Sequence, residues 1–99
     1  VMNLNLNFTG VNNGYELYQN VPNPFVKSTV VGFNLPSSMR GKLTVYDVTG
    51  KVLKVVEQTF NKGNNQVTLT RSELAASGIL YYTLETADYT ATKKMIILE

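Results

Sequence analysis

Two strand-like runs joined by a tight turn constrain the fold of this chain more than any other stretch. Lys42–Asp47 and Lys51–Val56 are rich in β-branched and aromatic residues, and the tetrapeptide Asp-Val-Thr-Gly connects them. The Asp47 carboxylate suits the first position of a type I turn, because it accepts a hydrogen bond from the backbone N–H two residues later. Gly50 suits the last position, where a left-handed φ disfavours side chains. The stretch therefore predicts a β-hairpin with a bulge.

Further alternating runs extend this pattern along the chain. In Thr29–Leu35 and Ile79–Thr86, apolar residues recur at every second position, which is the period of a strand. The remaining predicted strands are Tyr15–Gln19, Gln66–Thr70 and Tyr89–Glu99. Together with the hairpin, these runs give about seven strands at spacings near ten residues. They predict an all-β fold, an immunoglobulin-like antiparallel β-sandwich that lacks the cysteine pair and core tryptophan of antibody domains.

One segment, Thr70–Gly78, has helical character. Thr70 and Glu73 have the spacing of a capping box, in which each satisfies a free backbone N–H of the other. Gly78 is predicted to close the turn in left-handed geometry. With about two turns available, the segment predicts a short crossover helical turn rather than a layer of the fold.

The composition argues against catalysis and metal binding. The 99 residues contain no cysteine and no histidine, which removes thiolate chemistry, the usual general base and the commonest metal ligand. The seven acidic residues stand singly beside turns or basic residues. The net charge of +2 is small and dispersed, and no apolar run approaches the roughly 18 residues that span a bilayer. We expect no enzyme, no cofactor, no metal, no nucleic-acid partner and no direct membrane insertion.

The first fourteen residues differ from the rest. They are rich in asparagine, and their apolar residues alternate with it up to Phe8. We interpret residues 1–14 as a linker or the end of a preceding domain, with an edge strand of this fold as the alternative, and residues 15–99 as the domain. Because Val1 is no initiator, the chain is interpreted as a piece of a longer protein.

A proline-containing loop follows the first predicted strand. Pro22 and Pro24 fix two φ angles, and neither donates a hydrogen bond to a sheet. The loop is therefore expected at a sheet edge or at a crossing between sheets, with Phe25 as its apolar anchor. On physical grounds alone, a rigid entry loop explains these residues.

Five stretches of the chain form an ordered set that covers nearly the whole predicted domain. They are Tyr18–Phe25, Val31–Pro36, Leu43–Val52, Leu74–Tyr82 and Thr92–Leu98. Each stretch is weakly specific alone, but in this order they resemble the C-terminal sorting domain of the type IX (Por) secretion system of Bacteroidetes, in its type A form.

The resemblance implies a secretion signal that directs an attached cargo protein across the outer membrane. The implied partners are components of the type IX translocon, a sortase-like protease that removes the domain, and the covalently attached upstream cargo. The implied route runs through the periplasm to the cell surface or the medium, where the cargo is released or attached to an anionic lipopolysaccharide. Thr9–Gly14, polar and glycine-bearing, is the predicted cleavage stretch.

The resemblance also implies two sets of signature residues. The set assigned to recognition by the translocon is Pro22, Asn23, Pro24, Phe25, Lys51, Lys93, Lys94 and Met95. The set assigned to turn structure is Asp47, Gly50 and Gly78. For Lys93 and Lys94 a second interpretation stands beside recognition: adjacent strand residues face opposite ways, and lysine at a sheet edge discourages the addition of further strands.

Two other functions stay open at this point. The six tyrosines are compatible with a carbohydrate-binding or adhesive immunoglobulin-like module, since aromatic rings stack on sugars. The missing tryptophan weakens that interpretation, and core packing is expected to explain Tyr46 and Tyr82. A structural spacer is the third possibility.

Overall fold

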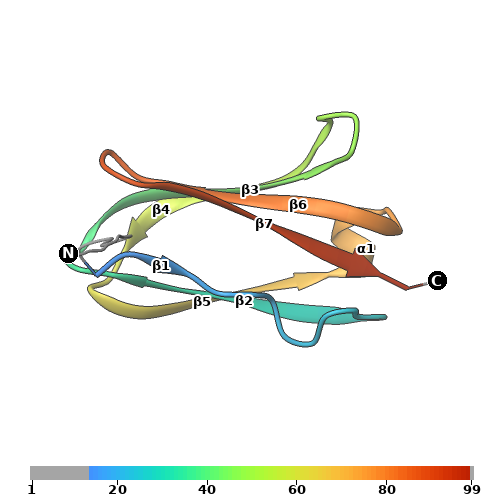
Figure 1. Ribbon diagram of the computed structural model, residues 1–99, viewed down its shortest axis with the longest axis horizontal. Helices are drawn as coiled ribbons and strands as arrows, with labels where there is room; N and C mark the ends of the chain where they lie inside the picture. Colours follow the sequence, from blue (N-terminus) through green and yellow to red (C-terminus); the bar gives the residue numbers. More distant parts are fainter. Residues whose placement is uncertain (1–13, 99) are drawn as a thin grey trace, which may run out of the picture.

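Two antiparallel sheets packed face to face make up the computed structural model, which describes residues 14–98 (Figure 1). The three-stranded sheet has the order β1-β2-β5, and the four-stranded sheet has the order β4-β3-β6-β7. The strands are β1 (Glu16–Leu17), β2 (Ser28–Leu35), β3 (Met39–Asp47), β4 (Val52–Phe60), β5 (Gly63–Thr70), β6 (Gly78–Glu85) and β7 (Thr90–Ile97). The helix α1 (Arg71–Leu74) connects the two sheets between β5 and β6. The predicted all-β sandwich is confirmed.

The core lies between the sheets and follows the alternation of the sequence. In β2, every second residue from Thr29 to Leu35 is buried, while the residues between them are partly exposed. In β6, Leu80, Tyr82 and Leu84 are buried and at most 1% exposed. The period-two pattern of the sequence predicted these inward faces correctly, because only one face of each sheet packs against the other sheet.

The β3–β4 turn has the predicted chemistry. Gly50 has φ of 91°, and its N–H donates to the Asp47 carbonyl at 3.0 Å. One carboxylate oxygen of Asp47 accepts hydrogen bonds from the N–H groups of Thr49 at 2.9 Å and Lys51 at 3.0 Å. The Thr49 hydroxyl also donates to it, and this bond is the main reason that the pKa of Asp47 is lowered. Beyond the turn, the register shifts between Val45 and Tyr46, which leaves Leu53 of β4 without a partner residue on β3.

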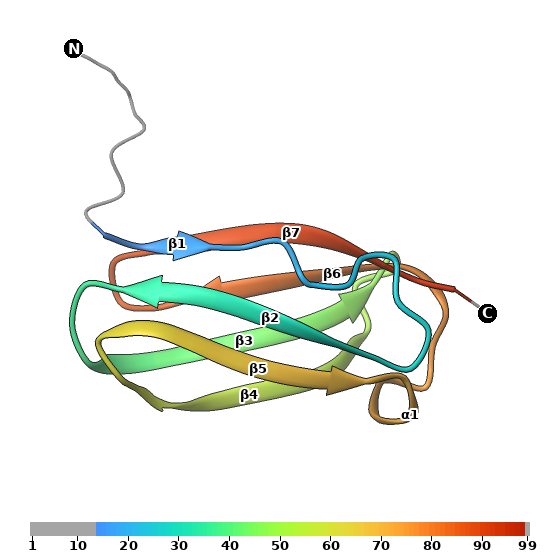
Figure 2. The same ribbon diagram turned by 90° about the horizontal axis from the view of Figure 1, so that it is seen from below.

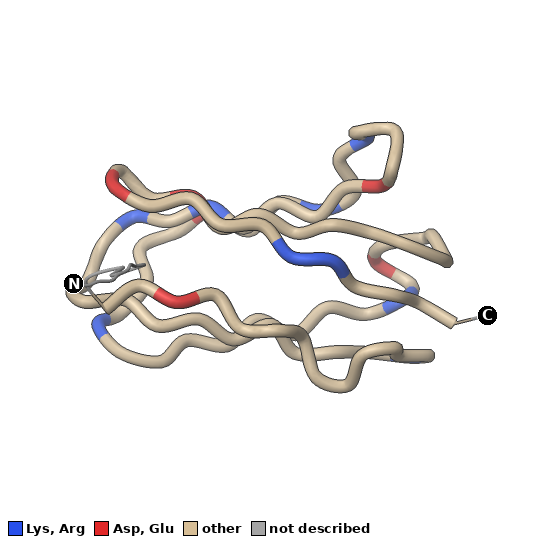
Figure 3. The backbone as a smooth tube through the Cα atoms, in the orientation of Figure 1, with Lys and Arg blue, Asp and Glu red and all other residues tan. Residues whose placement is uncertain are grey.

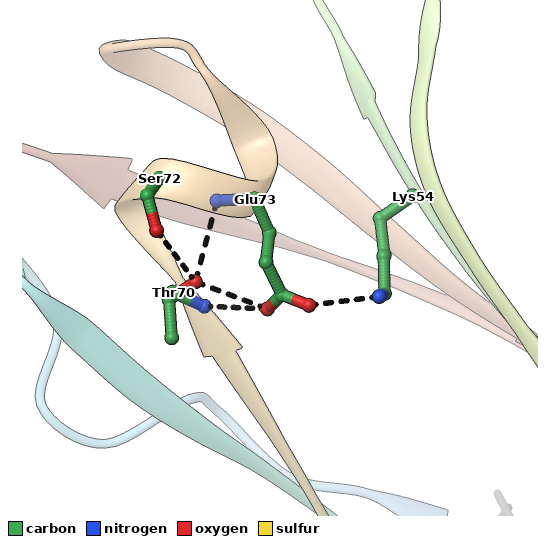
Figure 4. Close-up of polar contacts among 4 residues, drawn as sticks. All are labelled: Lys54, Thr70, Ser72 and Glu73. Carbon is green, nitrogen blue, oxygen red and sulfur yellow. Dashed lines mark hydrogen bonds and ion pairs between the residues drawn. The ribbon is translucent and has the colours of Figure 1, made fainter.

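The crossover helix begins as predicted and ends differently. The Thr70 hydroxyl accepts from the N–H of Glu73, and the Glu73 carboxylate accepts from the N–H of Thr70, which completes the capping box (Figure 4). Lys54 of β4 pairs with Glu73 at 2.8 Å and is the chief cause of its lowered pKa. Gly78 is left-handed as predicted, with φ of 89°, but it begins β6, and the prediction that it closes the helix was wrong. Ala75, at φ of 51°, ends the helix instead: its N–H donates to the Arg71 carbonyl at 2.9 Å, and the backbone becomes left-handed after this single turn.

Several boundaries differ from the predicted ones. The first predicted strand is ordered as a strand over two residues, Glu16–Leu17, rather than five. Strand β4 continues to Phe60, beyond the predicted end of the hairpin. Among residues 14–98, no helix is long and apolar enough to cross a membrane. The linker predicted at the start of the chain falls outside the described residues, apart from Gly14.

Candidate functional site

The loop between β1 and β2 crosses from one sheet to the other. At its start, Val21 exchanges two backbone hydrogen bonds with Val30 of β2, at 2.9 and 3.0 Å. At its end, Phe25 donates to the Ile96 carbonyl at 3.0 Å, and its own carbonyl accepts from the N–H of Leu98 at 2.8 Å. The expected crossing between sheets is therefore confirmed, and Figure 2 shows the loop reaching β7.

Buried polar groups hold the first half of this loop. Asn20 is 1% exposed, and its amide nitrogen donates to the Thr29 hydroxyl at 3.0 Å and to the Pro22 carbonyl at 3.2 Å. Thr29, also 1% exposed, donates to the same Pro22 carbonyl at 2.8 Å. The Tyr82 hydroxyl of β6 accepts from the N–H of Asn20 at 2.9 Å and donates to the Tyr18 carbonyl at 2.8 Å. Burial raises the pKa of Tyr82 to about 12.

Side chains of the same segment close the edge of β7. The side-chain oxygen of Asn23 accepts from the N–H of Ile96 at 2.9 Å. The side-chain amide of Gln19 donates to the Lys94 carbonyl at 2.7 Å. With the two bonds of Phe25, four hydrogen bonds cover the outer edge of β7 from Lys94 to Leu98. The edge strand that carries the lysines and the proline-containing loop are thus one structural unit.

The signature residues of the loop divide into exposed and buried members. Pro22, Asn23 and Pro24 are exposed, and the peptide bonds preceding both prolines are cis. The Phe25 side chain is 1% exposed and the Met95 side chain 0% exposed, so both belong to the core. Of these five residues, only the three loop residues are accessible at the surface, while the buried Phe25 and Met95 side chains fix where the loop and β7 lie.

The lysines lie at two places on the surface. Strand β7 is at the edge of the four-stranded sheet, as the edge interpretation requires. Lys94 is exposed on the outer face, while Lys93 is half-buried on the same side as Met95. Lys51 is exposed just past the β3–β4 turn. That turn, the end of β7 and α1 lie at the same end of the sandwich (Figure 1), whereas charged residues are otherwise scattered over the molecule (Figure 3).

The tyrosines do not form a single sugar-binding platform. Tyr82 is buried in the core as expected. The expectation that core packing explains Tyr46 was wrong: it lies on the outer face of β3, stacked on Tyr81 of β6 with ring centroids 5.9 Å apart. Its hydroxyl is 3.0 Å from that of Thr83. Tyr15 stacks on Tyr89 elsewhere, at 4.7 Å.

A surface cavity of about 790 Å³ lies beside α1, at the end of the sandwich that carries the C-terminus. Lys27 and Arg71 contribute its charged groups, with small and apolar residues around them. The Arg71 guanidinium donates to the Leu98 carbonyl, so it also holds the end of the chain in place. Among the described residues 14–98, its lining offers neither a carboxylate nor an imidazole for acid–base chemistry.

Sequence reasoning missed the residues that join the loop to β6 and β7. The sequence places Gln19, Asn20 and Thr29 in strands or in a motif without an individual role, and it predicts for Tyr82 only packing in the core. Their partners lie up to 75 positions away, as with Gln19 and Lys94. The one local signal is that two polar residues, Gln19 and Asn20, directly precede the loop.

Comparison with known proteins identifies one family. Residues 19–98 match the model of a family described as the secretion system C-terminal sorting domain. No curated protein matches the chain. The matched region begins with the side chain that bonds the Lys94 carbonyl and ends with the residue bonded to Phe25.

Proposed function

The chain belongs to the family of type IX secretion system C-terminal sorting domains, and on this premise we propose that the translocon reads the loop and the end of β7 as one composite surface. The domain is a sorting signal: it interacts with the type IX machinery and sends an attached upstream cargo across the outer membrane to the surface or the medium. The composite surface consists of the exposed loop residues Pro22–Pro24 and the edge residues Lys94 and Leu98.

Four hydrogen bonds support the composite surface. They tie Gln19, Asn23 and Phe25 to the outer edge of β7, so the loop and the end of β7 are held in a fixed position relative to each other. The prolines add rigidity, which lowers the conformational entropy that a partner must remove on binding. A receptor that contacts both segments recognises the folded domain and not a short linear peptide.

The lysines supply the charge of this surface. Lys94 is exposed next to the loop, and Lys51 is exposed at the same end of the sandwich. We assign Lys51 a peripheral contact, because its own turn is explained by Asp47 and Gly50 without any partner. Half-buried Lys93 serves mainly to protect the sheet edge, since an inward-pointing charge there discourages further strands.

The finer steps of export complete the proposal. The cargo passes through the periplasm, and specific outer-membrane components of the translocon bind the folded domain. A sortase-like protease then cuts within Thr9–Gly14, which lies outside the described residues apart from Gly14. The domain itself supplies no catalytic group to these steps. The match to the sorting family supports this function over a carbohydrate-binding or adhesive module.

Export of a reporter tests the proposal. Residues 15–99 are fused behind a signal peptide and a reporter in a host with a type IX system, and reporter in the medium is compared with reporter in the periplasm. We expect the fusion to be exported, and we expect deletion of Lys93–Glu99 to leave it in the periplasm. Asn23→Ala, which removes the bond to the N–H of Ile96, should reduce export. Asn64→Ala, at an exposed position of β5, is the matched control.

Two outcomes would contradict the proposal. Export that survives deletion of Lys93–Glu99 would show that the translocon does not recognise the end of β7. Equal export of the Asn23→Ala and Asn64→Ala fusions would show that the loop and β7 need not be held together. Protease resistance of each purified variant separates loss of recognition from loss of folding.

A further inference from the structure

Strand β4 is an uncovered edge, unlike β7. It is the terminal strand of the four-stranded sheet, on the side opposite β7 (Figure 2). Within residues 14–98, its outer side receives no hydrogen bond from a loop or side chain, whereas four such bonds close the end of β7. Unpaired backbone groups along an edge are a template for another strand.

The pairing of the sheet shows which backbone groups of β4 are free. In an antiparallel ladder, one residue directs both N–H and C=O to the same neighbour, and successive residues alternate. Ile96 directs both groups to the loop, so Met95 faces β6, where it pairs with Leu80. The next residue of β6, Tyr81, therefore faces β3 and pairs with Tyr46.

The same alternation carries across to β4. Val45, which precedes Tyr46, faces β4 and pairs with Lys54. Val55, Glu57 and Thr59 therefore direct their N–H and C=O groups away from the sheet. All three residues are exposed. They offer six hydrogen-bonding groups to an added strand.

Charge on the outer face specifies what such a strand carries. Glu85, Lys42 and Glu57 lie opposite one another on β6, β3 and β4, so charge alternates in sign along this row. The row ends at the edge on Glu57, which has no ion-pair partner in the described part of the chain. A lysine or arginine on an added strand continues the alternation, and a carboxylate there would be repelled.

The structure favours β4 over the other free edge and favours a foreign strand over a second copy. Strand β5 begins with Gly63, Asn64 and Asn65, residue types that are depleted in strands. Two copies of β4 paired antiparallel around Glu57 would place that carboxylate opposite itself. Lys54, which would protect the edge, is instead held by Glu73 of α1.

We propose that β4 is a strand-addition site for an extended segment of the type IX machinery, with a lysine or arginine opposite Glu57 and backbone bonds to Val55, Glu57 and Thr59. The added segment becomes the fifth strand of the four-stranded sheet. This inference rests on the sorting function proposed above and concerns a surface on the far side of the sheet from the loop and β7.

A synthetic strand tests the site in solution. The probe is an acetylated nine-residue peptide of alternating valine and threonine with one central lysine, and its control has a central glutamate. The lysine peptide should slow amide exchange at Val55, Glu57 and Thr59 when it binds. It should also bind about fivefold tighter than the control. Glu57→Lys should reverse that preference, while Glu85→Lys, two strands inward in the same row, should leave it unchanged.

Two results in solution would overturn the site. Exchange slowed at β5 or β7 instead of β4 would place strand addition elsewhere. A concentration-dependent dimer in sedimentation that Val55→Pro abolishes would assign the edge to a second copy. Proline at Val55 removes an outward N–H and no ladder bond, so it is suited to an edge position.

Export of the reporter fusion separates this inference from the sorting function. Val55→Pro and Glu57→Lys should each reduce export, while Glu85→Lys exports like the parent fusion. Wild-type export of both edge variants, with the Lys93–Glu99 deletion still retained in the periplasm, would refute the edge site and leave the sorting function standing. A parent fusion that stays in the periplasm would refute both. Glu57→Lys leaves the backbone intact, so it decides the matter if Val55→Pro fails to fold.

Discussion

The Tyr82 hydroxyl offers a direct test of how the loop is held. Its side chain is 0% exposed, and Tyr82→Phe keeps the ring while leaving the N–H of Asn20 and the Tyr18 carbonyl without this partner. A buried group left unpaired costs about 1–3 kcal/mol. The N–H of Asn20 belongs to a buried residue, so leaving it unpaired accounts for most of this cost. Tyr18 is an exposed residue, so water can replace the lost bond to its carbonyl. We therefore expect a loss of about 2 kcal/mol in the free energy of unfolding.

Urea unfolding measures this loss. With a slope of about 1 kcal/mol per molar urea, the midpoint falls by about 2 M, and the thermal midpoint falls by about 10 °C. Tyr46→Phe is the matched control, because its hydroxyl bonds Thr83 on the outer face, where water replaces it. We expect that change to stay within about 0.5 kcal/mol. A Tyr82→Phe variant as stable as the Tyr46→Phe variant would refute the reasoning.

The stability of the fold at alkaline pH gives an independent test of the Tyr82 hydroxyl. Burial raises the pKa of Tyr82 to about 12, above the value near 10 of an unfolded chain, so the folded state holds this proton more tightly. The resulting stability is present below pH 10 and is lost as the pH rises towards 12. Wild type should therefore lose about 2 kcal/mol more than Tyr82→Phe over this interval. Equal losses in the two proteins would show that Tyr82 is not the group responsible.

Three further substitutions test local features. Asp47→Ala should lower the thermal midpoint near neutral pH. Because the pKa of Asp47 is lowered in the fold, the difference in midpoint from wild type should vanish as the pH falls and the folded carboxylate is protonated. Thermal midpoints of both proteins measured against pH check this. Thr70→Ala should cost about 1 kcal/mol in urea unfolding, since it removes the side-chain half of the capping box. Gly41→Ala should cost about 1–3 kcal/mol, because its Cβ would lie 3.1 Å from the Phe60 ring, and the ring contact with Phe33 should weaken in nuclear Overhauser spectra.

Local chemistry predicted much of this fold. Asp47 and Gly50 are three positions apart, and turn geometry alone places them. Thr70 and Glu73 satisfy each other within one helical turn, so the helix start was predictable as well. The prediction that Gly78 closes the helix failed because glycine preference is only a tendency: Gly78 does adopt a positive φ, but Ala75 does so three residues earlier and ends the helix there.

The candidate site was predictable as a set of residues but not as an arrangement. The sequence indicated the loop and the last strand separately, and it assigned Phe25 and Met95 to recognition although both side chains lie in the core. No local pattern indicates that the Asn23 side chain caps the N–H of Ile96. Such contacts depend on how two sheets meet, which only the packed structure fixes.

The bond between Asn23 and Ile96 joins positions 73 residues apart, and a ribosome delivers them in that order. While the chain leaves the ribosome, the Asn23 side chain lacks its hydrogen-bond donor, the N–H of Ile96, until nearly the whole domain has been synthesised. The second half of the loop therefore cannot be fixed early. A chain that terminates before Ile96 lacks the β7 backbone groups that bond Asn23 and Phe25. The second half of the loop therefore takes its final position only after β7 has been synthesised, although its first half can form with β2 long before.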